Sequence, residues 1–342
     1  MPADHKEEAM NRLSTLIEAH PRATDIHITE GGPVFLREQG ALYRMEPIPE
    51  LLPELEAGLT AEKKTIWEQG GTIDGSFSTG GVRCRLHLYR SAGRKAAALR
   101  LLPALDHLPP DRDEPWMVRL SACRSGLILI TGPAGSGKST ALARFVQILA
   151  ERPCHIITIE DPPEYEFSSG RALIHQREVG ADTASFALGV REALREDPDV
   201  LIIGEMRDAE TMAAALTAAE TGHLVLATLH DGSAAGAVGR LVHAFPADRE
   251  SEVRSLLASV LRAAAAQKLC RTGGRTFLLR EILTNTPAVA HLIREGKDEQ
   301  LLSYMEMGQP PMRTMKQALR QILAEETLSP EEAEQLRQAA EA

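Results

Sequence analysis

The chain has 342 residues and a formal net charge of −10, and 43% of its residues are hydrophobic whereas 4% are aromatic. This length suits about two domains, and the apolar content supports a packed core of aliphatic side chains, which excludes global disorder. The acidic balance argues against a broad nucleic-acid surface, because such surfaces are basic.

The first 102 residues have the pattern of a small α/β domain. Helices are predicted over residues 6–20 and 51–69. The clearest strand is 82–89, where apolar and polar residues alternate with the period of a half-exposed strand. Further strands are predicted over 25–29, 33–37, 42–45, 71–77 and 96–101.

A proline-rich stretch then separates this domain from a second one. Residues 103–115 contain four prolines and are predicted to be an interdomain linker, because proline interrupts helices and sheets. Over 116–342, short apolar runs alternate with helical stretches, as in a parallel sheet covered on both faces. Strands are predicted over 127–131, 155–160, 200–203 and 224–228, and helices over 141–150, 208–221, 251–269 and throughout 286–342.

Two of these helices have specific sequence support. Asp208 is a favoured N-cap, and Gly222 comes just past the end of the helix at 208–221. The helix at 251–269 has apolar residues along one face and contains the alanine run 263–266, which favours a helix.

The most informative motif is GPAGSGKST at residues 132–140. It fits the phosphate-loop pattern G-x-x-x-x-G-K-[ST] and lies between an apolar strand and a helical run; a chance glycine turn is the alternative. Backbone N–H groups can surround phosphate oxygens, Lys138 can reach the outer phosphates, and the Ser139 hydroxyl can bind Mg²⁺. The predicted ligand contacts in this motif are Gly132, Gly135, Ser136, Gly137, Lys138, Ser139 and Thr140.

Acidic residues follow two other predicted strands. Glu205 comes after strand 200–203, where it could hold Mg²⁺ through water or polarise an attacking water. Open α/β sheets bind ligands at the carboxyl ends of their strands, although an ordinary strand-end acid or a solvated turn is the alternative. The second group, after strand 155–160, consists of Glu160, Asp161, Glu164 and Glu166.

Histidines and arginines complete the candidate residues. His223 and His230 flank strand 224–228 and could sense or relay the state of a phosphate, or could be surface residues. The arginines near the end of the first domain could form a solvated strand face, or could neutralise a γ-phosphate in a neighbouring subunit. They are Arg83, Arg85, Arg90, Arg94 and Arg100.

The cysteines and the apolar runs bear on the compartment. The four cysteines include no C-x-x-C pair, which argues against a structural zinc site and a disulfide scaffold and favours a reducing compartment. The N-terminus lacks a signal-peptide pattern, and no run of 18 apolar residues could span a bilayer. We therefore expect a cytoplasmic protein whose membrane role, if any, passes through a protein partner.

Taken together and in order, the motifs resemble those of the secretion/pilus ATPase family over nearly the whole chain. T-D-I-H-I at 24–28 is similar to the family's opening strand, and GPAGSGKST to its Walker A motif. I-E-D-P-P-E at 159–164 resembles its Asp box, G-E-M-R-D at 204–208 its Walker B segment, and 221–230 its His box. The stretch 287–295 is similar to one associated with retraction of pili.

This resemblance implies an α/β fold with a RecA-like P-loop NTPase core, an N-terminal PAS-like domain and C-terminal helices. It implies a homohexameric ring that binds ATP and Mg²⁺. The implied activity is ATP hydrolysis that powers type IV pilus retraction and twitching motility. The implied partner is an inner-membrane platform protein, and through it pilin, with neither membrane insertion nor a nucleic-acid partner.

The resemblance also implies roles for single residues. Glu164 would be the general base that orients the attacking water, Glu205 the Walker B acid and Mg²⁺ ligand, and His230 a catalytic residue of the His box. The other implied nucleotide contacts are Glu160, Asp161, His223, Arg85, Arg100 and, by a shifted alignment, Arg94.

Departures from the family pattern leave alternatives open. Asp231 and Gly232 replace the usual residues after the His box, and Ala290 and His291 replace an R-N pair in the retraction stretch. The absence of a zinc tetracysteine and of a long N-terminal extension favours the retraction class. The alternatives are an accessory retraction motor, an assembly or type II secretion ATPase, a RecA-like nucleic-acid translocase, and a scaffold that binds ATP without hydrolysing it.

Overall fold

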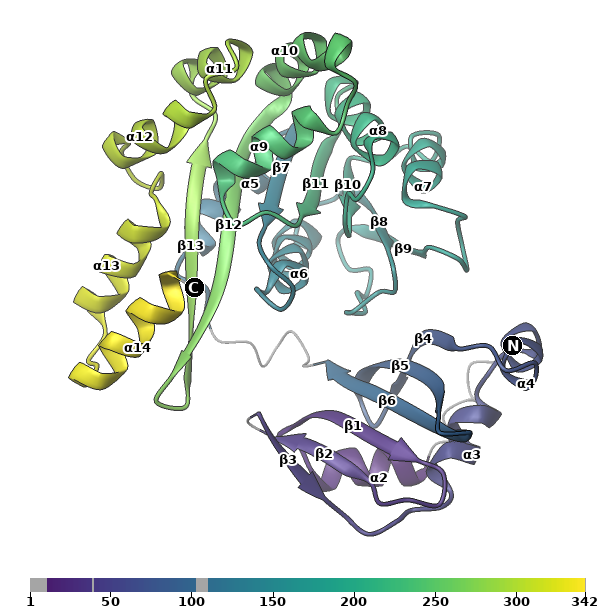
Figure 1. The fold of residues 1–342 in the computed structure, drawn as a ribbon. Helices are drawn as coiled ribbons and strands as arrows, with labels where there is room; N and C mark the ends of the chain where they lie inside the picture. The colour runs from purple at the N-terminus through teal and green to yellow at the C-terminus, as the bar shows by residue number, and fades with distance from the viewer. Residues whose placement is uncertain (1–10, 39, 103–109, 342) are drawn as a thin grey trace. The chain divides into compact units, whose positions relative to one another are not determined.

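The computed structural model describes residues 11–38, 40–102 and 110–341, which form two compact units (Figure 1). Residues 6–10 of the first predicted helix and 103–109 of the predicted linker lie outside the described residues. The predicted domain boundaries therefore remain predictions. The N-terminal unit holds the described residues up to 102 and Pro162–Glu166, and the C-terminal unit holds Pro110–Asp161 and the residues from Phe167 onward.

The N-terminal unit is built on an antiparallel sheet of six strands. The strands are β1 (Ala23–Thr29), β2 (Phe35–Glu38), β3 (Ala41–Arg44), β4 (Ile73–Thr79), β5 (Val82–Ser91) and β6 (Arg94–Leu102). The helices are α2 (Asn11–Ala19), α3 (Leu51–Ala57) and α4 (Ala61–Glu68). The strand order is β3-β2-β1-β6-β5-β4, and Ile26 and Ile28 of β1 share a core with Leu13 of α2 and Leu51 of α3.

The prediction of one helix over 51–69 is wrong, because the chain forms two helices there. Thr60 has an extended backbone, with φ of −66° and ψ of 161°, and its side chain accepts a hydrogen bond from the Lys63 N–H. That geometry is an N-cap, which starts a new helix. The sequence carries signals of this break, because Gly58 follows the first helix and threonine is a favoured N-cap residue.

The C-terminal unit contains a sheet of seven strands with helices on both faces (Figure 1). Its strands are β7 (Gly126–Thr131), β8 (His155–Glu160), β9 (Leu173–Glu178), β10 (Val200–Ile203), β11 (Leu224–Leu229), β12 (Leu261–Thr272) and β13 (Arg275–Thr284). Its helices are α5 (Glu114–Ser121), α6 (Lys138–Ala150), α7 (Phe186–Ala193), α8 (Ala209–Glu220), α9 (Ala234–His243), α10 (Glu250–Val260), α11 (Pro287–Arg294), α12 (Glu299–Met307), α13 (Met315–Glu325) and α14 (Pro330–Glu341), with a short 3-10 helix at Ala247–Arg249.

Strand β7 is buried on both faces, as its continuous apolar run predicts. Leu127 and Leu129 belong to one core with residues of α8, α9 and α10, and Ile128 and Ile130 to another with residues of α5 and α6. The strand order is β13-β12-β7-β11-β10-β8-β9, and every neighbouring pair is parallel except β12 and β13. The predicted α/β sheet covered on both faces is confirmed.

The prediction of a helix over 251–269 is wrong from residue 261 onward. Helix α10 ends at Val260, and β12 begins at Leu261 and pairs with both β7 and β13. All four alanines of the run 263–266 are completely buried, and they alternate between the two faces of the sheet. Pairing with two strands and burial on both faces outweigh the small helix preference of alanine, which is below about 1 kcal/mol per residue.

The predicted helical character of residues 286–342 is confirmed as four helices, α11 to α14. Helices α13 and α14 pack on the β12–β13 hairpin through a core that includes Cys270, Phe277, Ile322 and Leu336. Within the described part of the chain, no helix is both long enough and apolar enough to cross a membrane.

Candidate functional site

The strands that precede the candidate residues end at one edge of the C-terminal sheet. β7, β11, β10 and β8 are successive parallel neighbours, so their carboxyl ends meet there. The phosphate-loop motif follows β7, Glu160 ends β8, Glu205 follows β10 and His230 follows β11. The fold therefore gathers four separate motifs of the sequence at one place.

The phosphate-loop motif turns from β7 into α6 through conformations that favour glycine. Gly132, Gly135 and Gly137 have φ angles of 147°, 74° and 88°. A Cβ on Gly132 would lie 2.4 Å from the carbonyl oxygen of Gln267 in β12, so the loop passes directly against that strand. Helix α6 starts at Lys138, and a helix N-terminus that follows such a loop is suited to bind an anion.

Side chains add donors to this loop. Lys138 is 9% exposed, and its Nζ donates hydrogen bonds to the carbonyl oxygens of Gly132 at 2.8 Å and Pro133 at 3.0 Å. The Ser136 hydroxyl is buried and has no hydrogen-bond partner within the described residues. An ammonium, a buried hydroxyl and a helix N-terminus together fit the oxygens of a phosphate.

A line of polar contacts joins this lysine to the acid after β10. His230 Nδ1 lies 3.5 Å from Lys138 Nζ, and His230 Nε2 lies 3.5 Å from Glu205 Oε2. A neutral imidazole with its proton on Nε2 would accept from the lysine and donate to the carboxylate. Glu205 is also paired with Arg207, with 2.7 Å between Oε1 and Nε. The structure thus brings together Lys138, Glu205 and His230.

Glu160 is held rigidly at the end of β8. Its Oε1 accepts hydrogen bonds from Thr158 Oγ1 at 2.6 Å and from Gln176 Nε2 at 3.1 Å. Asp161, the next residue, is exposed. A carboxylate fixed by two donors keeps its orientation while an exposed neighbour can reorient, so the two acids are suited to different tasks.

Glu164 belongs to a segment that groups with the other unit. Pro162–Glu166 is part of the N-terminal unit, where Glu166 pairs with Arg83. The Arg83 guanidinium also donates to Ser76 Oγ at 2.6 Å. The role of Glu164 as general base therefore remains a prediction.

The two histidines of the His box lie at opposite ends of β11. His223 precedes the strand, where its Nδ1 lies 3.0 Å from the Ala218 carbonyl oxygen and 3.3 Å from Thr221 Oγ1. At about 3.3 Å per residue, His223 and His230 are separated by roughly 20 Å along the strand. Within this chain, the structure does not bring His223 to the phosphate loop, and its role remains a prediction.

The three arginines that the resemblance assigns to the nucleotide lie at two places in the N-terminal unit. Arg85 and Arg100 are exposed and directly opposite each other on β5 and β6, whereas Arg94 lies at the hairpin between these strands. Like charges opposite each other repel, and Asp25 offsets this by pairing with Arg100, with 3.1 Å between Oδ1 and Nε. Arg85 and Arg100 thus form a small basic patch that Arg94 does not join.

The residues at the sheet edge suit Mg²⁺ as a companion of phosphate. The Ser139 hydroxyl and the Glu205 carboxylate are oxygen ligands, which Mg²⁺ prefers. Within the described ranges, no group of three or more His, Cys, Asp or Glu is arranged for a metal. The arrangement fits an ion that is bound through one or two protein oxygens, phosphate oxygens and water.

Two further residues lie at this site and are not apparent from the sequence pattern, Gln267 and Glu281. The sequence pattern places Gln267 in a helix over 251–269, whereas it lies in strand β12, and the pattern does not predict strand β13, which carries Glu281. One feature of the sequence could have indicated Gln267, because this glutamine directly follows four small apolar residues. A polar side chain in a buried strand usually has a hydrogen-bond partner.

Glu281 is a buried carboxyl group beside the loop that follows His230. It is 3% exposed, and it accepts hydrogen bonds from the Ala234 N–H at 2.8 Å and the Met315 N–H at 3.1 Å. Burial raises the pKa of Glu281, and the charge of Asp231 raises it further, against the lowering effect of these two bonds. The folded protein therefore holds a proton on Glu281 at pH values where the unfolded chain has lost it.

This raised pKa predicts a pH-dependent difference between the wild-type protein and Glu281→Gln. The unfolded chain loses the proton near pH 4.5, so the contribution of Glu281 to stability decreases as pH rises from there through the higher folded pKa. The denaturation midpoint of Glu281→Gln, relative to wild type, should increase between about pH 4.5 and pH 7. A difference between the two midpoints that is constant across this range would contradict the prediction.

The chain is similar to known proteins of secretion systems and type IV pili, and one of the similar solved structures holds a nucleotide. The family model described as type II/IV secretion system protein matches residues 104–335. The twitching motility protein of Neisseria gonorrhoeae is 40% identical over 310 residues, which cover 87% of this chain and 82% of that protein. The type IV pilus retraction ATPase PilT of Pseudomonas aeruginosa is 38% identical over 323 residues, which cover 91% of this chain and 93% of that protein. A crystal structure of the pilus retraction motor PilT with bound ADP superposes with a TM-score of 0.82 at 38% identity, covering 95% of this chain and 96% of that one.

Proposed function

The chain belongs to the type II/IV secretion system protein family, and from this membership we propose that it is an ATP-hydrolysing motor that powers type IV pilus retraction. The resemblance seen in the motifs is confirmed by relatives that are 38% and 40% identical over most of the chain, and the predicted α/β fold by the superposition on the solved PilT structure. The observation that carries the proposal is the line of contacts from Lys138 through His230 to Glu205 at a phosphate loop. The crystal structure of the pilus retraction motor PilT, which is 38% identical to this chain, contains bound ADP.

The phosphate loop would bind the triphosphate of ATP. Lys138 would exchange its bonds to the loop carbonyls for phosphate oxygens, and the N–H groups at the start of α6 would hold the β-phosphate. Mg²⁺, when bound through Ser139 and Glu205, would neutralise the charge that develops on the phosphates. Because His230 contacts both Lys138 and Glu205, a shift of either group would change the hydrogen bonds of the imidazole.

Hydrolysis would follow by in-line attack of water on the γ-phosphorus. The bond from that phosphorus to the oxygen of the leaving ADP breaks as the new P–O bond forms. Glu164 is the proposed general base that receives the proton of the water. Arg85 and Arg100 are the proposed cations that neutralise γ-phosphate charge, and their juxtaposition on β5 and β6 supports that assignment.

The motor would act as a homohexameric ring. We propose that the ring works on the cytoplasmic side of the inner membrane and passes its motion to the pilus platform protein, and so indirectly to pilin. The stretch Pro287–Arg294 forms α11, in which Ala290 is buried and His291 is exposed. His291 is therefore the altered position of the retraction stretch that a partner could contact.

Deletion of the gene distinguishes retraction from assembly. Loss of a retraction motor should leave cells with surface pili in excess, because assembly continues unopposed, and electron microscopy can count these pili. Bald cells would refute the retraction assignment and indicate an assembly motor. A pilus number equal to wild type would instead indicate an accessory motor that works beside a principal one.

A further inference from the structure

Gln267 is a buried polar residue that lies against the phosphate loop. It is 2% exposed in strand β12, next to Ala266, which is in register with Thr131, the last residue of β7. Its backbone carbonyl is the group that a Cβ on Gly132 would meet. The strand and the loop are therefore in direct contact at the point where the loop begins.

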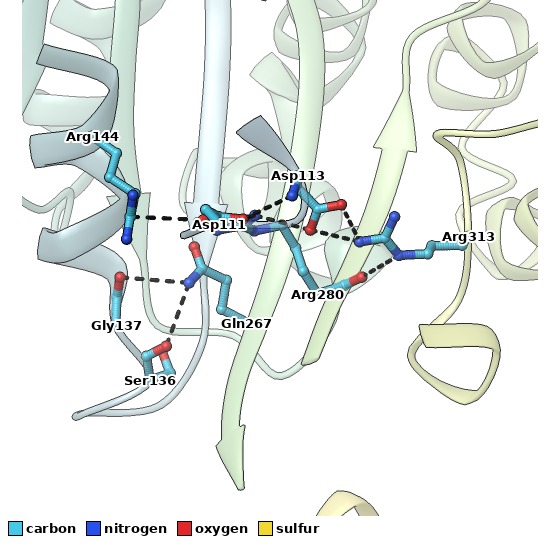
Figure 2. Close-up of polar contacts among 8 residues, drawn as sticks. All are labelled: Asp111, Asp113, Ser136, Gly137, Arg144, Gln267, Arg280 and Arg313. Carbon is cyan, nitrogen blue, oxygen red and sulfur yellow. Dashed lines mark hydrogen bonds and ion pairs between the residues drawn. The ribbon is translucent and has the colours of Figure 1, made fainter. Parts of the chain in front are cut away.

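The side chain of Gln267 reaches the other end of the same loop. Figure 2 shows its amide nitrogen directed at two consecutive loop carbonyls. Nε2 lies 3.4 Å from the carbonyl oxygen of Ser136 and 3.5 Å from the carbonyl oxygen of Gly137. Both contacts are long. The contact to the Ser136 carbonyl is buried, where a carbonyl without a donor is costly, whereas the Gly137 carbonyl is part-buried and also accepts a hydrogen bond from the Ala141 N–H at 2.9 Å. One side chain thus serves two adjoining peptide groups.

Those contacts, together with the helical hydrogen bond from the Ala141 N–H to the Gly137 carbonyl, orient two peptide N–H groups. In a trans peptide the C=O and the N–H of one unit point in opposite directions. With the carbonyls of Ser136 and Gly137 turned toward Gln267, the N–H groups of Gly137 and Lys138 point away from β12. These two belong to the set of N–H groups with which a phosphate loop surrounds its ligand.

A buried ion-pair network lies on the strand next to Gln267. Its cross-strand partner is Arg280 in β13, which is 1% exposed and lies on the same face of the hairpin (Figure 2). Arg280 donates to Asp111 Oδ1 at 2.8 Å and Oδ2 at 2.9 Å, and to Asp113 Oδ2 at 2.9 Å. Arg313 also donates to Asp113, at 2.6 Å from each oxygen.

The same network returns to the helix that follows the phosphate loop. Arg144 of α6 lies with its Nε 4.0 Å from Asp111 Oδ2 (Figure 2). The ion pair between Arg144 and Asp111 therefore joins α6 to the network that also holds Arg280, the cross-strand partner of Gln267.

We propose that Gln267 is a positioning residue for nucleotide binding, which holds the phosphate loop so that the N–H groups of Gly137 and Lys138 face the ligand. This inference rests on the proposed function, because it assumes that the loop binds the phosphates of ATP or ADP. Gln267 acts through the loop backbone and does not itself touch the nucleotide.

The test measures the affinity of the purified full-length protein for a fluorescent ADP derivative. Gln267→Met keeps the length of the side chain and removes its donor, so the dissociation constant should rise about tenfold to hundredfold. Lys268→Met is the matched control, because Lys268 is the next residue of the strand and donates to the Ala340 carbonyl at 3.2 Å. That control should bind as wild type does.

The dissociation constant and the number of binding sites separate positioning from a structural role. Loss of positioning raises the dissociation constant, whereas loss of folded protein lowers the number of sites. A Gln267→Met protein that binds as tightly as wild type would overturn the inference, even if it were less stable or bound at fewer sites. If Gln267→Met does not fold, Gln267→Asn carries the same expectation, because its amide is one methylene too short to reach both carbonyls. If the wild-type protein binds no nucleotide, the proposed function fails, and this inference fails with it.

Discussion

Lys138→Ala is expected to lower ATP turnover at least about 100-fold. Its ammonium group is the buried cation of the phosphate loop, where it already donates to two loop carbonyls. Replacing those carbonyls by phosphate oxygens would neutralise charge in the transition state, and losing one such donor typically costs 10²-fold or more. The variant also leaves His230 without its neighbour at Nδ1.

The measurement is phosphate release by the assembled full-length protein at saturating ATP and Mg²⁺. Lys297→Ala is a suitable control, because Lys297 is exposed and lies between α11 and α12. It should hydrolyse ATP at the wild-type rate. Turnover by Lys138→Ala within a few-fold of wild type would show that hydrolysis does not use this loop.

Among the substitutions considered, Asp111→Ala is expected to cause the largest loss of stability. The unfolding free energy of the C-terminal unit should fall by about 3–5 kcal/mol. Arg280 is completely buried and shares two hydrogen bonds with Asp111. Removing this carboxylate leaves the positive charge of the buried guanidinium only partly neutralised, because Asp113, which also pairs with Arg280, is already shared with Arg313. The substitution exchanges a bidentate ion pair for a buried charge.

Urea denaturation followed by tryptophan fluorescence can measure this loss. Trp116 lies 5.8 Å from the Arg280 guanidinium, so its emission should report on this part of the C-terminal unit. Asp248→Ala, at an exposed site in the short 3-10 helix, should unfold as wild type does. A midpoint for Asp111→Ala equal to that of this control would contradict the role of the network.

The contribution of Asp111 should also depend on pH. Burial opposes ionisation of this carboxyl, but the hydrogen bonds and the charge of Arg280 outweigh burial and lower its pKa below the usual 3.8. Its stabilisation is therefore fully present above pH 3.8 and is lost as pH falls through the lower folded pKa. The difference between wild type and Asp111→Ala should shrink in that acid range.

The sequence predicts those parts of the site that depend on local pattern. The phosphate loop is recognisable because its glycines, lysine and serine are adjacent in the chain. Glu205 and His230 could be placed beside it because each follows an apolar strand of a parallel sheet, and parallel strands end at one edge. Predicting that these residues lie close together requires only the order of the strands and helices along the chain.

Other parts depend on contacts between distant segments, which local pattern does not contain. The alanines at 263–266 favour a helix in isolation, and only pairing with β7 and β13 makes them a strand. The roles of Gln267 and Arg280 cannot be predicted from local pattern, since their placement depends on that hairpin. His223 lies away from the phosphate loop because it precedes β11, whereas His230 follows it, and the two predicted positions at the ends of this strand already imply that separation.

The central claim is that ATP hydrolysis at this site powers pilus retraction, and the rate at which labelled pili shorten in live cells tests it most directly. Cells that lack the native gene would carry either the wild-type chain or Lys138→Ala at matched protein levels. We predict that pili shorten with the wild-type chain and extend without shortening with Lys138→Ala. Shortening at the wild-type rate with Lys138→Ala would contradict the claim.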